Sequence, residues 1–161
     1  MGEAKTMVAL IGNPVSNKGW GAVVGEQVFT MLAEAGQRHG FDVMDLTGTS
    51  FDDSLTAARE NRALYDYLVV VGGDGMIALG ANAVCGSGIP LGIVAVGSGN
   101  DFARGLKLPV NRVKTAVEAS SAPSHAAPIW MSIWDACARR RSPAWCMASP
   151  VSPWWMRKAA R

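Results

Sequence analysis

Apolar residues follow two different patterns along the first 120 residues, and the two patterns alternate. Short, continuous apolar runs such as YLVVV at 67–71 end at glycine, as strands buried on both faces of a parallel sheet do. Between these runs, apolar side chains recur every three or four residues, as Val24, Val28 and Leu32 do, which predicts helices. The predicted strands are 7–11, 41–46, 67–71 and 91–96, and the predicted helices are 21–39, 51–64, 75–84, 101–106 and 110–119.

This alternation of strand and helix is typical of βαβ units, whose strands lie parallel in one sheet. We therefore expect an α/β fold with an open, mostly parallel sheet and helices on both faces. The order of the strands does not follow from the pattern.

Composition is consistent with one ordinary domain and a short appendage. The chain has 161 residues, of which 49% are hydrophobic and 17% charged, which excludes a disordered chain. No apolar run reaches the roughly 18 residues of a membrane-spanning helix, and the run near the N-terminus is too short for a signal peptide. The three cysteines form no CxxC pair. We expect a soluble protein of a reducing compartment, the cytoplasm.

The composition changes near residue 120. All 18 glycines lie at or before Gly105, whereas residues 119–161 hold six basic residues and one acidic residue, Asp135. A Ser/Ala/Pro stretch, SSAPSHAAP, joins the two parts and resembles a linker. We therefore divide the chain into an α/β domain at 1–120 and a linker with an irregular tail at 121–161.

Three polar, glycine-containing loops each follow a predicted strand, at 13–19, 72–75 and 97–101. Ligands of open α/β sheets bind at the carboxyl ends of the strands, and glycine lets the backbone approach a phosphate closely. Asp74 and Asp101 would repel phosphates unless a divalent cation lay between them, which favours Mg²⁺. Taken singly, each loop could be a tight turn, Asp74 a helix cap and Arg104 a surface charge. Their convergence on one edge of the sheet favours a site.

Three strings in this order, NPVSN, VVVGGDGMIALGANAV and IPLGIVAVGSGNDFARGLKLP, resemble the catalytic domain of the diacylglycerol kinase family, which includes bacterial lipid kinases and the sphingosine and ceramide kinases. The resemblance runs from about residue 7 to about residue 117. It implies an ATP-dependent lipid kinase with an NAD kinase-like fold. In that family, the nucleotide lies between this α/β domain and a C-terminal β-sandwich.

The resemblance also implies roles for individual residues. Ser98 stands where the family usually has Thr, Asn17 replaces a Gly and Met76 replaces a Thr; Thr49 lies close enough to Thr47 to be confused with it. Asp74 is the implied catalytic residue, and Asp74 and Asp101 are the implied metal ligands. The implied nucleotide-binding residues are Asn13, Pro14, Val15, Ser16, Asn17, Thr47, Gly72, Gly73, Asp74, Gly75, Met76, Ile77, Ala78, Ser98 and Asn100.

The implied mechanism is positioning and electrostatic stabilisation, in which a lipid hydroxyl attacks the γ-phosphorus of ATP. The implied general base is an acidic residue of the C-terminal domain. The implied partner is a lipid substrate, diacylglycerol or a related lipid, met peripherally at the inner membrane face. The sequence leaves open whether the chain forms a homo-oligomer, and no nucleic-acid partner is expected.

Residues 129–161 match nothing in the family. They lack glycine and are rich in Arg, Trp, Pro and Ser, which is typical of a GC-rich gene translated in the wrong frame. We hypothesise a truncated or frameshifted product with impaired activity. An interfacial membrane anchor built from the tryptophans and arginines is a weaker alternative, because three prolines interrupt any long helix. For the whole chain, the alternatives are a non-catalytic nucleotide-binding module and an NAD kinase-like enzyme.

Overall fold

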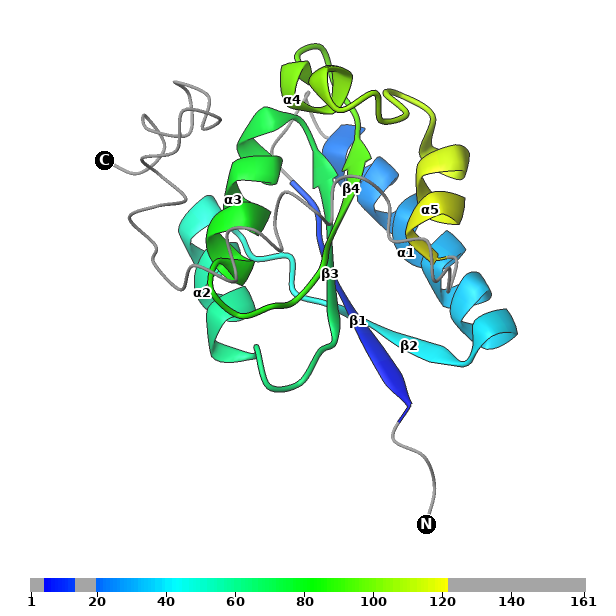
Figure 1. Ribbon diagram of the computed structural model, residues 1–161, viewed down its shortest axis with the longest axis vertical. Coiled ribbons are helices and arrows are strands. Elements are labelled where there is room, and N and C mark those ends of the chain that lie inside the picture. The colour runs from blue at the N-terminus through cyan, green and yellow to red at the C-terminus, as the bar shows by residue number, and fades with distance from the viewer. Residues whose placement is uncertain (1–4, 14–19, 122–161) are drawn as a thin grey trace.

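Four parallel strands form a single sheet in the structure of the chain, a computed structural model that describes residues 5–13 and 20–121 (Figure 1). The elements in chain order are β1 (Thr6–Ile11), α1 (Trp20–His39), β2 (Phe41–Asp45), α2 (Phe51–Glu60), β3 (Tyr67–Gly72), α3 (Asp74–Val84), β4 (Leu91–Ala95), α4 (Asp101–Gly105) and α5 (Val113–Ser121). The predicted α/β fold with a parallel sheet is confirmed. The predicted tail lies outside the described residues.

The strand order is β2-β1-β3-β4, so the chain leaves β1 toward one edge of the sheet and later leaves β3 toward the other. β1 lies directly beside β3, with Ile11 paired to Val70. The carboxyl ends of β1 and β3 therefore flank the point where the winding reverses. Ligands of doubly wound sheets bind at this point, because the two outgoing loops separate there and leave a crevice.

Alternate side chains of the strands enter two separate cores, as the period of two along a strand requires. Ile11 and Val70 pack on the face covered by α2 and α3. Leu10 and Val69 pack on the opposite face, against residues of α1 and α5 such as Leu32. Helices thus cover both faces of the sheet, and its ends and loops are left to hold a site.

Helix α2 ends at Glu60, so the prediction that it continues to residue 64 is wrong. The backbone N–H and the side-chain Nδ2 of Asn61 both donate to the Ala57 carbonyl, at 3.1 Å and 2.8 Å. Asn61 therefore caps the helix with its own amide, as Asn does well at helix ends. Tyr65 follows and is buried; its hydroxyl donates to the Ala58 carbonyl at 2.8 Å, and burial raises the pKa of Tyr65.

Helix α5 begins at Val113, and the prediction that it begins at residue 110 is also wrong. Val110 forms a parallel bridge with Ala95 at the end of β4, and the N–H of Asn111 donates to the Ala95 carbonyl at 2.9 Å. This segment is therefore a short continuation of the sheet. Among residues 5–13 and 20–121, no helix has the combined length and hydrophobicity needed to cross a membrane.

Candidate functional site

The three predicted loops follow β1, β3 and β4, and because these strands are parallel their carboxyl ends lie at one end of the sheet, the end where α4 follows β4 (Figure 1). Of the first loop, the structure describes Asn13. The predicted nucleotide contacts Pro14, Val15, Ser16 and Asn17 lie outside the described residues.

Thr47 joins the segment after β2 to the segment after β1. Its Oγ1 accepts a hydrogen bond from the Gly12 N–H at 2.9 Å, and its own N–H donates to Asp45 Oδ1 at 2.8 Å. Thr49, in contrast, donates its hydroxyl to Asp53. This bond, with those from Ser50, lowers the pKa of Asp53. Thr47 is therefore the threonine that contacts the β1 loop, whereas Thr49 belongs to the start of α2.

Gly72 lets the loop after β3 pass close to its neighbours. Its φ is 148°, and a β-carbon added there would lie 2.5 Å from Met76 Cγ and 4.0 Å from Asn13 Cβ. A side chain at this position would clash with α3, which explains the glycine. The same geometry places Asn13 of the first loop beside the second loop.

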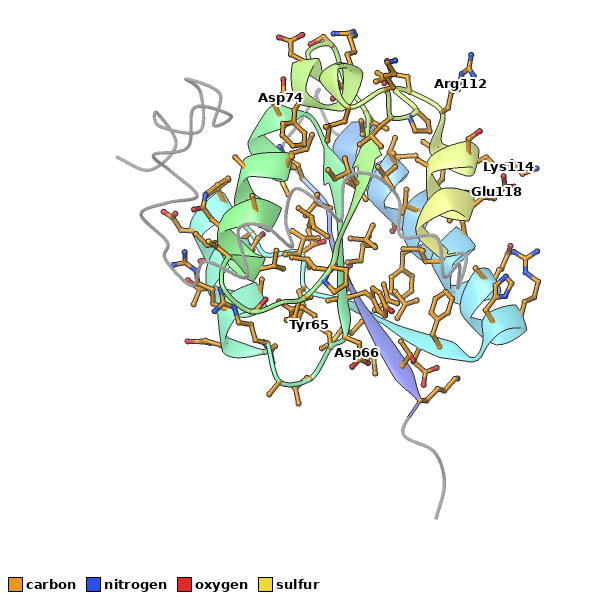
Figure 2. The ribbon with its side chains drawn as sticks, viewed as in Figure 1. Tyr65, Asp66, Asp74, Arg112, Lys114 and Glu118 are labelled. Atoms are coloured by element: carbon orange, nitrogen blue, oxygen red, sulfur yellow. The ribbon has the colours of Figure 1, made fainter. Side chains whose placement is uncertain are left out.

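Asp74 joins the second loop to the third. Figure 2 labels Asp74, the first residue of α3. Its Oδ2 accepts the Asp101 N–H at 3.1 Å and its Oδ1 accepts the Phe102 N–H at 3.2 Å, so one carboxylate binds two amides in the first turn of α4. A β-carbon added to Gly99 would lie 3.3 Å from Asp74 Oδ2, so the third loop approaches this carboxylate closely. The sequence left open that Asp74 caps the helix it opens, but Asp74 is the first residue of α3 and its carboxylate binds the first N–H groups of α4 instead.

Asn100 lies at the centre of the third loop, fully buried, with left-handed backbone angles of φ 65° and ψ 35°. Asn tolerates this conformation better than most residues. Its Nδ2 donates to the Gly97 carbonyl at 3.0 Å. Its Oδ1 is buried and has no hydrogen-bond partner within the described residues. A β-carbon added to Gly73 would lie 3.6 Å from this oxygen, so Asn100 also faces the second loop.

Two further side chains bind the third loop: Asn111, which no sequence motif marks, and Arg104, which the sequence left open as a surface charge. Asn111 Oδ1 accepts the Gly97 N–H at 2.9 Å, and its Nδ2 donates to the Gly97 carbonyl at 3.2 Å. Arg104 donates to the Gly99 carbonyl and lies 3.3 Å from Asp101 Oδ1. Both side chains hold the third loop in place. The motif beginning at Gly97 could have suggested Arg104, but no local signal marks Asn111.

Several other predicted nucleotide-binding residues have side chains that are buried in the protein core. Met76, Ile77 and Ala78 are buried residues of α3, and the N–H groups of Met76 and Ile77 donate to the Gly73 carbonyl at 2.9 Å and 3.2 Å. Gly75 and Ser98 are exposed at the same end of the sheet. That these residues contact a nucleotide stays a prediction.

The described residues fit a cation held mainly by phosphates. Within residues 5–13 and 20–121, no three His, Cys, Asp or Glu side chains cluster as a metal site. Mg²⁺, however, commonly takes only one or two protein oxygens beside phosphates and waters. Asp74 and the unpartnered Asn100 Oδ1 lie at this junction of loops, whereas the Asp101 side chain is 84% exposed. The roles of Asp74 and Asp101 as metal ligands stay predictions.

A groove of about 920 Å³ lies elsewhere, between α1 and α5. It is lined by apolar side chains such as Met31 and Val117 and by charged ones such as Glu34, Lys114 and Glu118, the last two labelled in Figure 2. None of the predicted site residues lines it.

Comparisons with known proteins agree on one family. The sequence model of the diacylglycerol kinase catalytic domain matches residues 7–129. Two curated proteins called diacylglycerol kinase, from Mycobacterium tuberculosis strains CDC 1551 / Oshkosh and ATCC 25618 / H37Rv, are each 32% identical over 113 residues. The match covers 69% of this chain and 35% of each relative, so the chain spans about a third of their length.

Two solved structures of a protein of Bacillus anthracis str. Sterne, proposed to be a diacylglycerol kinase, share the fold at 24% identity. The first has a TM-score of 0.59 and covers 74% of this chain and 40% of that one. The second has a TM-score of 0.54 and covers 72% and 39%.

Proposed function

The chain belongs to the family of the diacylglycerol kinase catalytic domain, and from this premise we propose that it is the nucleotide-binding part of an ATP-dependent lipid kinase. The reaction transfers the γ-phosphoryl group of ATP to a hydroxyl of diacylglycerol or a related lipid, with Mg²⁺ as the cation. Such a substrate is presented at a membrane surface, where the protein would act peripherally.

The observation that carries this proposal is the contact of Asp74 with Asp101 and Phe102. It fixes the loop after β3 to the loop after β4, beside the crevice where the sheet reverses its winding. The hydrogen bond from Gly12 to Thr47 fixes the start of the loop after β1 in the same way. Loops held in place before the ligand arrives lose less freedom on binding and orient the phosphates for in-line transfer.

In this proposal, the described residues hold the nucleotide. Gly73 is half-buried and Gly75 is exposed beside the start of α3, an 11-residue helix, so the backbone there is open to an anion, while the buried Gly72 shapes the turn that leads to it. When bound, Mg²⁺ neutralises charge on the transferring phosphoryl group. The removal of the lipid hydroxyl proton needs a general base. The family resemblance implies that this base belongs to a C-terminal domain.

The first test is calorimetric titration of the full chain with MgATP, comparing the native protein with Asp74→Asn. An amide side chain has one acceptor and one donor, so it turns an N–H toward one of the two α4 amides. We expect MgATP affinity to fall at least tenfold and the free energy of unfolding to fall by about 1–3 kcal/mol. Glu60→Gln removes an exposed carboxylate at the last residue of α2, the end of the helix that leads to the amino end of β3, and should leave affinity unchanged.

The second test is transfer of labelled phosphate from ATP to diacylglycerol in mixed vesicles. Transfer by the full chain supports the kinase proposal in full. Binding of MgATP without transfer favours the alternative of a non-catalytic nucleotide-binding module. An absence of MgATP binding by the folded native chain would contradict both.

A further inference from the structure

The Asn100 carboxamide is satisfied on one side only. Its Nδ2 donates to the Gly97 carbonyl at 3.0 Å, which fixes the orientation of the amide and leaves Oδ1 on the other side. That oxygen is buried, in a residue with no exposed surface, and lacks a partner within the described part of the chain. Leaving a buried acceptor unsatisfied destabilises a folded protein. Such an exception in an otherwise bonded structure requires an explanation.

The chemistry of this atom limits what can satisfy it. A carboxamide oxygen accepts hydrogen bonds and binds cations, but it donates nothing. A phosphate oxygen without a proton is also an acceptor, so it cannot be the missing partner. The partner is either a hydrogen-bond donor or a cation.

The surroundings of Oδ1 favour a cation. A β-carbon added to Gly73 would lie 3.6 Å from Oδ1, so bare glycine backbone borders the atom on the side of the second loop. The next residue, Asp74, holds its carboxylate against the third loop, with Oδ2 3.3 Å from a β-carbon added to Gly99. Each Asp74 oxygen accepts one amide and keeps a further lone pair. Carboxylate and carboxamide oxygens at one junction of loops are the hard ligands that Mg²⁺ prefers.

We propose that Asn100 Oδ1 binds the divalent cation that accompanies the ATP phosphates, directly or through a water that the cation holds. This inference rests on the proposed nucleotide-binding function and deepens it, because it makes Asn100 a ligand of the metal ion and not of a phosphate group. The left-handed backbone of Asn100 turns its side chain inward at this position.

The test measures cation affinity separately from nucleotide affinity, with the full chain. Mn²⁺ is titrated into the protein–ATP complex and its free concentration is read by electron paramagnetic resonance, while ATP affinity is measured by calorimetry in EDTA. Asn100→Gly removes the carboxamide and accepts the left-handed backbone without strain. We expect it to weaken Mn²⁺ binding about tenfold, as loss of a ligand-shell group does. ATP affinity in EDTA should change less than twofold.

Two further variants keep the proposal testable if Asn100→Gly is poorly folded. Gly73→Ala adds a methyl group at van der Waals distance from Oδ1, at backbone angles that alanine adopts, and should weaken Mn²⁺ binding in the same way. Asn100→Asp keeps an oxygen and adds charge, so it should bind Mn²⁺ more tightly and gain more thermal stability from it than the native chain. Gly105→Ala lies in an exposed position with open space around it and is the control that should change neither affinity.

The other outcomes overturn the inference. An equal loss of ATP affinity with and without cation would assign Oδ1 to a donor group of the nucleotide. Unchanged affinities with a lower melting temperature would assign it to an internal water. Native protein that binds ATP in EDTA but shows no Asn100 effect on Mn²⁺ contradicts this inference alone, whereas native protein that binds no nucleotide contradicts the proposed function as well.

Discussion

At the scale of single residues, the conformation of the third loop depends on side chains of residues other than its glycines. Three non-glycine residues, Asn100, Lys107 and Asn111, have positive φ values of 65°, 57° and 54°. Such angles cost energy unless neighbouring contacts enforce them. Asn111 makes such contacts: its side chain binds both the N–H and the carbonyl of Gly97 and so holds the start of the third loop in place.

Asn111→Gly should therefore weaken both the fold and the site. Glycine keeps the φ of 54° without strain but removes two hydrogen bonds, each worth about 0.5–1.5 kcal/mol. We expect the free energy of unfolding in urea to fall by about 1–2 kcal/mol. MgATP affinity, measured by calorimetry well below the melting temperature, should fall several-fold because the loop loses its anchor.

The matched control for Asn111→Gly is Lys107→Gly, at a positive φ of 57° with an exposed side chain. It should leave MgATP affinity unchanged and leave stability equal or slightly higher. If Asn111→Gly loses stability but keeps full affinity, Asn111 supports the fold and has no positioning role.

Residue-scale prediction from sequence succeeded where a motif is local. The order of the glycines and Asp74 was enough to place these residues at one end of the sheet. The sequence favoured Thr47 over Thr49, but which of them contacts the end of β1 needed the structure, because the two differ in their partners: Gly12 for Thr47 and Asp53 for Thr49. Asn111 could not be found, because its partner Gly97 lies fourteen residues earlier.

At the scale of elements, α3 is shaped by contact with the sheet more than by helix propensity. A β-carbon added to Gly80 would lie 2.6 Å from Val70 Cγ1 and 2.8 Å from Leu91 Cδ1. Residues from β3 and β4 therefore occupy the space that a side chain would need. The small residues of this helix, evident in the sequence, let it lie close against two strands.

Gly80→Ala should destabilise the protein although alanine is the better helix former. The steric overlap should cost about 1–3 kcal/mol, which outweighs a propensity gain of about 1 kcal/mol. Gly25→Ala in α1, where nothing lies within 4 Å of the added carbon, should be neutral or stabilising. Urea denaturation of both variants measures the difference, and equal stabilities would show that α3 can move away from the sheet at little cost.

Hydrophobic periodicity predicted the presence and order of all nine described elements, but the end of α2 and the start of α5 were wrong by four and three residues, and the other boundaries differ by two residues at most. Asn61 ends α2 by capping it, while the chain beyond still contains helix-compatible Ala and Leu. Val110 pairs with Ala95 instead of starting α5. In both cases a hydrogen bond made by one residue decided the boundary, and an average over apolar positions cannot detect it.

At the scale of the whole molecule, the proposed site depends on the strand order, which the sequence did not predict. The order β2-β1-β3-β4 places the loops after β1 and β3 side by side, and β4 brings the third loop next to them. Any order that separated β1 from β3 would have divided the same motifs between distant places. The proposed site is thus a property of the topology as much as of the residues.

The topology also predicts where a bound nucleotide protects the backbone. MgATP should slow amide hydrogen exchange about tenfold or more in residues 12–13, 72–75 and 97–102, because opening of these loops would require loss of the ligand. Near Asp66 and Pro90, at the amino ends of the same strands, the rate of amide exchange should not change.

The groove between α1 and α5, of about 920 Å³ and lined by Glu34 and Lys114, is the alternative location for a nucleotide. Protection confined to α1 and α5 would place the nucleotide in that groove and contradict the proposed site, while protection of the three loops alone would place it at the carboxyl ends of the strands.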